Sequence, residues 1–121
     1  MNQNPNYDLE ERLLNYAAKI VELCNVQYTT FAAQHISRQL LRSGTSPLAN
    51  HGEAESSEST KDFIHKLSIS LKELRESNRW LLLIQKTNIF PDASYLPHLL
   101  NETDQLIRIF VASIKTAKKR L

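Results

Sequence analysis

The sequence is poor in the residues that end helices and cross-link chains. Its 121 residues include two glycines, four prolines and one cysteine. So few turn-forming residues disfavour a fold of many short strands, which needs a turn between each pair. The single cysteine, Cys24, excludes a disulfide framework within the chain and a zinc site built from paired cysteines. These shortages predict an all-α protein in a reducing compartment.

The sequence also lacks a large excess of either charge and lacks long apolar runs. Lysine and arginine number 15 and aspartate and glutamate 13, which gives a net charge of +2. This balance permits nucleic acid or an acidic protein as a partner without requiring either. No basic and apolar leader is present, and the longest apolar run is far shorter than the roughly 20 residues that span a bilayer. We therefore expect a cytoplasmic protein without a membrane partner.

Hydrophobic periodicity and capping residues predict four helices. We expect them at residues 9–25, at 31–42 with a short continuation over 47–55, at 60–86 and at 95–119, after a disordered lead-in at residues 1–6. Asp8 is expected to cap the first helix, and Ser59 or Thr60 the third. Helices of similar span joined by short turns predict an all-α, antiparallel up-and-down four-helix bundle, formed by a single domain over residues 1–121.

The second helix carries the strongest interruption signal of the chain. Gly44 suits a left-handed cap that ends a helix, and Ser46 with Pro47 suits the start of a new one. We therefore expect this helix to be kinked near Gly44 and Pro47. Ser46, Asn50 and Glu53 are interpreted as a structural polar junction at the restart.

The helix expected at residues 60–86 has three faces. Its core seam recurs at alternating spacings of three and four: Ile64, Leu67, Leu71, Leu74, Asn78 and Leu81. A second apolar face, made by Ile69, Trp80 and Leu83, exceeds what one small bundle can cover and is the candidate oligomer interface. The third face is basic, with Lys61, Lys72, Arg75, Arg79 and Lys86.

Basic residues lie opposite the core in the last three expected helices. One interpretation is a solvated surface in which Lys72 and Arg79 pair with Glu76 along the helix. The other is a track of phosphate contacts. The candidate nucleic-acid-binding residues are Arg38, Arg42, Lys61, Lys72, Arg75, Arg79, Arg108, Lys115 and Lys119.

No pattern in the sequence predicts catalysis. Ser46 is better explained as a helix cap than as a nucleophile, since the second glycine of a nucleophile elbow is missing. The histidines His35, His51, His65 and His98 fall in different elements without a ligand at metal spacing. His35 is expected on the surface. We therefore expect no metal, no cofactor and no enzyme activity.

Acidic residues are expected to fix the register between helices. Glu53, Glu73 and Glu76 could form paired carboxylates in space, but ion pairs with Arg42 or Lys72 are the favoured interpretation. Such pairs would be structural rather than catalytic.

Three stretches of the chain resemble a known family. The chain is similar in these stretches to the bacterial four-helix-bundle proteins called 23S ribosomal RNA intervening-sequence proteins: Tyr7 to Leu14, Arg42 to Ala54, and Asp62 to Leu67 continuing into Leu71 to Leu74 with Trp80. The most specific run is Ser-Gly-x-Ser-x-x-Ala-Asn-x-x-Glu-Ala, which here is Ser43 to Ala54. The resemblance implies a bundle that assembles into a ring of five. A similar group, the accessory proteins of diversity-generating retroelements, is thought to bind nucleic acid and a reverse transcriptase through basic surface.

Two hypotheses of function follow. The first is a homo-oligomeric accessory factor, a homopentamer by the resemblance, that binds RNA or DNA through its basic helix faces. The second is a structural or protein-interaction scaffold that does not bind nucleic acid. The distribution of charge in space distinguishes them, because basic faces that converge favour the first, and basic faces interleaved with glutamates favour the second.

Overall fold

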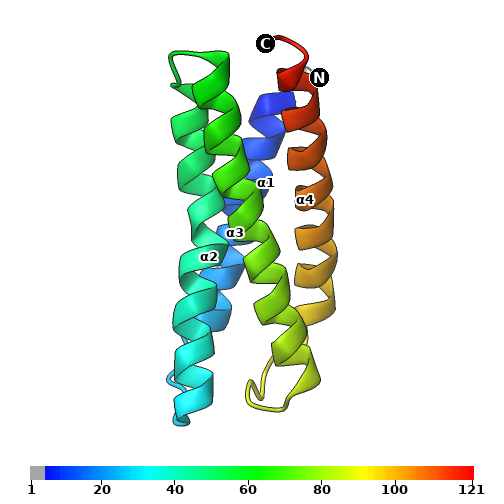
Figure 1. Cartoon of the computed structure of the whole chain (residues 1–121). Helices are drawn as coiled ribbons and strands as arrows, with labels where there is room; N and C mark the ends of the chain where they lie inside the picture. The colour runs from blue at the N-terminus through cyan, green and yellow to red at the C-terminus, as the bar shows by residue number, and fades with distance from the viewer. Residues whose placement is uncertain (1–4) are drawn as a thin grey trace.

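The computed structural model describes residues 5–121 and contains four helices there. They are α1 (Pro5–Cys24), α2 (Phe31–Glu55), α3 (Thr60–Lys86) and α4 (Leu96–Lys118). Short connections at residues 25–30, 56–59 and 87–95 reverse the chain between them, so α1 begins and α4 ends at the same end of the bundle (Figure 1). The expected fold class is confirmed.

The longest helix, α3, begins and ends where the sequence predicts. The Ser59 hydroxyl accepts a hydrogen bond from the Asp62 backbone N–H at 3.0 Å and so caps the first turn. Asp62 also places a negative charge at the positive end of the helix dipole, and Lys86 lies in the last turn. These local preferences agree with the packing of the helix, which explains the accurate bounds.

The expected interruption of the second helix is wrong in its boundaries. Helix α2 runs unbroken from Phe31 to Glu55 with Pro47 inside it, and no described residue has a positive φ, so Gly44 is not a left-handed cap. A proline inside a helix costs one backbone hydrogen bond. Gly44 and Pro47 are both buried, and their packing against neighbouring helices offsets that cost.

Gly44 instead allows α1 and α2 to approach closely. A Cβ atom added at Gly44 would lie 2.8 Å from Cγ2 and 2.9 Å from Cγ1 of Ile20, which is fully buried. At Gly52, on the same helix, an added Cβ would meet no atom within 4 Å. The first glycine is therefore required by helix packing rather than by a turn.

The start of α1 also differs from the prediction. The helix begins at Pro5, so Asp8 lies in its first turn and is not its cap. Proline is well suited to a first helical position, where its missing N–H has no partner to lose. The expected lead-in at residues 1–6 falls on residues 1–4, which lie outside the described residues, and on the first turn of α1.

The core seam predicted for α3 is shifted in the structure. Leu67, Leu74 and Leu81 are buried as expected, whereas Ile64, Leu71 and Asn78 are only half-buried. Ser70 and Ser77 are fully buried in their place. The small side chains allow α3 to approach α2, because they fill less space than leucine between the two helices.

A polar layer crosses the middle of the core and connects all four helices. The Ser77 hydroxyl of α3 donates to the Ser43 hydroxyl of α2 at 2.8 Å, and the Tyr16 phenol of α1 lies 2.7 Å from the Thr103 hydroxyl of α4. Thr103 donates its own proton to the Leu99 carbonyl, so Tyr16 is the donor in their bond. Burial raises the pKa of Tyr16 to about 12, although hydrogen bonds to Thr103 and Ser77 oppose the shift.

One end of the bundle is closed by the connection between α3 and α4. Phe90 is buried and its ring lies 4.4 Å from that of Tyr28, while Ile89 packs against the core. No helix among residues 5–121 has the length and hydropathy needed to cross a membrane.

Candidate nucleic-acid interface

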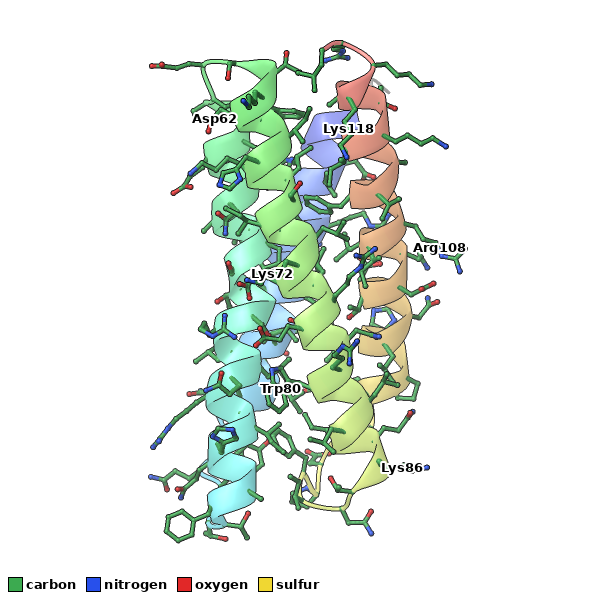
Figure 2. All side chains as sticks on the ribbon, in the orientation of Figure 1. Asp62, Lys72, Trp80, Lys86, Arg108 and Lys118 are labelled. Atoms are coloured by element: carbon green, nitrogen blue, oxygen red, sulfur yellow. The ribbon has the colours of Figure 1, made fainter. Side chains whose placement is uncertain are left out.

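A row of exposed cations follows the outer side of α3. We call it the α3 basic face; it consists of Lys61, Lys72, Arg75, Arg79 and Lys86. All of these side chains are exposed, and none takes part in an ion pair with another described residue. Figure 2 shows Lys72 near the middle of α3 and Lys86 at its end. The row covers almost the full length of the helix.

The acidic residues that alternate with these cations in the sequence are held on another side of α3. Arg42 of α2 donates from Nη1 to Glu73 at 2.9 Å and from Nη2 to Glu76. The Trp80 indole N–H also donates to Glu76, at 3.0 Å. The carboxylates are less exposed than the arginine that covers them, at 13% and 31% against 51%. They therefore face α2 rather than the basic face.

The sequence allowed two sets of ion pairs for these glutamates, one within α3 and one with Arg42 of α2. The predicted ion pairs between Glu76 and its helical neighbours Lys72 and Arg79 do not form, because Arg42 and Trp80 take the Glu76 carboxylate. The predicted use of Glu73 and Glu76 as partners of Arg42 is confirmed. Folding thus separates charges that lie within one helical turn of each other in the sequence.

The other candidate cations differ in their surroundings. Arg42 is occupied by two carboxylates, and Arg108 of α4 is paired with Asp104 at 3.0 Å. Arg38, Lys115 and Lys119 are exposed and form no ion pair with a described residue. Lys118 lies next to Lys119 in the sequence. Figure 2 shows it at the end of α4, at the same end of the bundle as the start of α3. The α3 basic face is the longest unpaired group.

The three residues of the candidate oligomer interface differ in their exposure. Ile69 and Trp80 are half-buried, and the Trp80 ring meets the ring of His35 edge-on with centroids 6.1 Å apart. His35 itself is exposed. Leu83 remains 41% exposed and its neighbour Leu82 47%. One chain therefore covers part of the second apolar face through α2 and leaves the end near Leu83 open.

The expected polar junction on α2 has two separate parts. The Asn50 amide donates to the carbonyl and the hydroxyl of Ser46 one turn earlier, at 3.1 and 2.9 Å. Glu53 instead binds Lys66 of α3 at 3.0 Å and raises the pKa of that lysine. Ser46 and Asn50 therefore act within α2, while Glu53 connects two helices.

A buried histidine on α2 is a further polar contact that the sequence did not reveal. His51 is 3% exposed, with Nδ1 2.5 Å from Glu10 of α1 and Nε2 3.3 Å from Glu55. Its ring meets Phe110 of α4 edge-on. The spacing of four residues between His51 and Glu55 was the available signal, but nothing in the sequence indicates the contact with α1.

Side chains that could carry chemistry are occupied in structural roles. Burial raises the pKa of the Cys24 thiol to about 12, which suppresses the reactive thiolate at neutral pH. Arg12 binds Glu102 at 2.6 Å, which raises the pKa of that arginine and ties α1 to α4. Within residues 5–121 no cluster of three or more histidine, cysteine, aspartate or glutamate side chains is arranged to hold a metal ion.

Comparison with known proteins gives the family. The profile described as 23S rRNA-intervening sequence protein matches residues 7–112. The chain belongs to this family. A crystal structure of a protein of unknown function from the S23 ribosomal protein family of Bacteroides thetaiotaomicron VPI-5482 is 33% identical, with a TM-score of 0.81 over 91% of this chain and 97% of that one. No curated protein matches the sequence at a significant level.

The match to the 23S rRNA-intervening sequence proteins includes the features described above. It contains Arg42, both carboxylates that Arg42 binds and the whole α3 basic face. It ends at residue 112, before Lys115 and Lys119 near the end of α4. The predicted family and fold are therefore confirmed together. The α3 basic face lies in the part of the chain that the family shares.

Proposed function

We propose that this chain is a non-enzymatic accessory protein that binds nucleic acid through the α3 basic face. The observation that carries the proposal is the pairing of Arg42 with Glu73 and Glu76, which leaves Lys72, Arg75 and Arg79 without a carboxylate partner. A row of cations facing solvent is the usual complement of a phosphate backbone, since each contact releases a condensed counterion. The net charge of the whole chain, +2, does not reflect this local concentration of positive charge on α3.

The other exposed cations lie on the two helices that pack against α3. Lys115 and Lys119 lie on the helix next to α3, and Arg38 lies on the other side, on α2. Arg42 and Arg108 are weaker contacts, because their charges are already balanced by carboxylates. The α3 basic face is therefore the primary contact in this proposal and the remaining cations are secondary.

Self-association belongs to the same proposal. Leu83 and the half-buried Trp80 are apolar surface that one chain does not cover, and large uncovered patches are typical of interaction sites. Several copies would repeat the α3 basic face, so that a few phosphate contacts from each chain give a high combined affinity. The ring of five implied by the family resemblance is one such arrangement.

Fluorescence anisotropy with labelled RNA and DNA duplexes over a range of salt concentrations tests the proposal. Binding should weaken linearly in log affinity against log salt, with a slope of about −0.9 for each phosphate contact. The variant Lys72→Gln/Arg75→Gln/Arg79→Gln should reduce the slope by about 2.7 and the affinity on the order of 100-fold near 0.1 M salt.

A matched variant controls for net charge. Lys115→Gln/Lys118→Gln/Lys119→Gln removes the same charge from α4 and should weaken binding much less. Circular dichroism should show that both variants stay folded, because all six side chains are exposed. Equal losses from the two variants would refute the assignment to α3. No binding at low salt would favour a protein-interaction scaffold.

A further inference from the structure

The aromatic side chains near the α3 basic face are not available to stack on bases. Trp80 lies between α2 and α3 (Figure 2), with its N–H bonded to Glu76 and its ring against His35. Phe90 and Phe110 are buried, and Tyr28 donates its phenol proton to the Leu23 carbonyl. Proteins that hold single strands combine a basic groove with rings on which bases stack. The α3 basic face offers the charge without the rings.

The most exposed aromatic ring among the described residues lies on another helix. Phe31 is 92% exposed and is the first residue of α2. A single ring can stack one base, but a stacking track needs a ring for each of several successive bases. Phe31 is therefore not a stacking platform, and its replacement serves as a control for base stacking.

The spacing along α3 suits the two walls of a groove in a double helix. Lys72, Arg79 and Lys86 are each seven residues apart, which places them about 10.5 Å apart along the helix axis. The major groove of a DNA duplex is about 12 Å wide and is bordered by phosphates on both sides. Arg75 and Arg79 lie one turn apart between Lys72 and Lys86, so the row can contact phosphates on both sides of one groove.

We propose, resting on the function proposed above, that the ligand of the α3 basic face is a double-stranded nucleic acid held along its phosphate backbone. A duplex presents phosphates at fixed positions, which a rigid row of cations can match without ordering the ligand. A flexible single strand loses conformational freedom when it binds, and the α3 basic face has no stacking contacts to offset that loss.

Competition between duplex and single-stranded probes tests this inference. The unmodified protein is measured by anisotropy with a duplex of about 20 base pairs, longer than the roughly 40 Å of α3, and with an oligothymidylate of the same strand length. An RNA duplex and a DNA duplex are both used. At least one duplex should bind about tenfold or more tightly than the oligothymidylate.

The outcomes separate this inference from the function on which it rests. Equal or tighter binding of oligothymidylate would overturn the preference for a duplex and leave nucleic-acid binding intact. Loss of affinity in Phe31→Ala would likewise overturn it, by showing that stacking contributes; we expect Phe31→Ala to bind the duplex as the unmodified protein does. Failure of every probe at low salt would overturn both proposals.

Discussion

Alanine at the two glycines of α2 is expected to have opposite effects on stability. Gly44→Ala would place a methyl group 2.8 Å from Cγ2 of buried Ile20, so α1 and α2 must move apart. Such overpacking costs about 1–3 kcal/mol. Gly52→Ala meets no atom within 4 Å and should stabilise by about 0.5–1 kcal/mol, because alanine restricts the unfolded chain and favours the helix.

Chemical denaturation of both variants measures the difference. The Gly52 variant is the matched control, since it makes the same change in the same helix. A Gly44→Ala protein as stable as the unmodified one would show that the α1–α2 contact can relax without cost.

Tyr16 predicts a loss of stability in alkali. Its pKa in the folded protein is about 12, above the ordinary 10.0, because burial disfavours the phenolate. A raised pKa stabilises the fold fully below pH 10, and this contribution disappears as the pH rises from 10 to 12. The loss should be on the order of 2–3 kcal/mol.

Tyr16→Phe isolates this contribution. At neutral pH the variant should be less stable by about 1 kcal/mol, since it lacks the bond to Thr103. Above pH 10 it should lose less stability than the unmodified protein, so that the two denaturation curves converge or cross. A variant with an undiminished alkaline loss would assign that loss to other groups, such as Tyr28.

At the residue scale the sequence was informative about caps and core leucines and misleading about small residues. Ser59 was recognised because an N-cap is local: its hydroxyl reaches a backbone group three residues away. Gly44 was interpreted by the same local logic, although its role depends on Ile20 of another helix. The roles of Ser77 and His51 were likewise not predictable from nearby residues. Their partners Ser43 and Glu10 become neighbours only after folding.

Between elements, Arg42 controls how α2 and α3 divide their charges. Arg42→Gln should leave Glu73 and Glu76 without a cation and lower the unfolding free energy by about 1–2 kcal/mol, a modest value because the arginine is half exposed. The released carboxylates should also turn toward Lys72 and Arg79 and weaken nucleic-acid binding.

Arg38→Gln provides the comparison for that variant. It removes the same charge from the same helix, but Arg38 forms no ion pair with a described residue. Thermal denaturation and anisotropy should both show the larger effect for Arg42→Gln. Identical behaviour of the two variants would mean that the ion pairs do not shape the α3 basic face.

The helices were predicted with unequal accuracy for a physical reason. In α3 and α4, the capping residues, the helix propensity and the positions of proline agree with the observed bounds, although the core seam of α3 is shifted. In α2 they conflict, since glycine and proline favour a break while the neighbouring helices favour a continuous helix. Tertiary packing decided the outcome. The basic face on α3 was predicted from periodicity, but its freedom from ion pairs could not be, because it depends on Arg42 of another helix.

For the whole molecule, adjacent leucines test the proposed self-association. Leu83 extends the apolar face of Ile69 and Trp80, whereas Leu82 points about 100° away around the helix. They are similarly exposed, at 41% and 47%. Leu83→Glu should reduce the native mass of the protein in light scattering, and Leu82→Glu should not. A native mass unchanged by Leu83→Glu would exclude this face as the contact between copies.

The division of charge by Arg42 implies that α3 alone is not equivalent to α3 in the bundle. In an isolated peptide of residues 60–86, Glu73 and Glu76 would be free to pair with Lys72, Arg75 and Arg79, so that two of these three cations would be neutralised. The folded chain separates the same residues into an acidic side that faces α2 and a basic side that faces solvent. The concentration of positive potential on one side of α3 is thus a property of tertiary structure, and it would weaken on unfolding although no residue had changed.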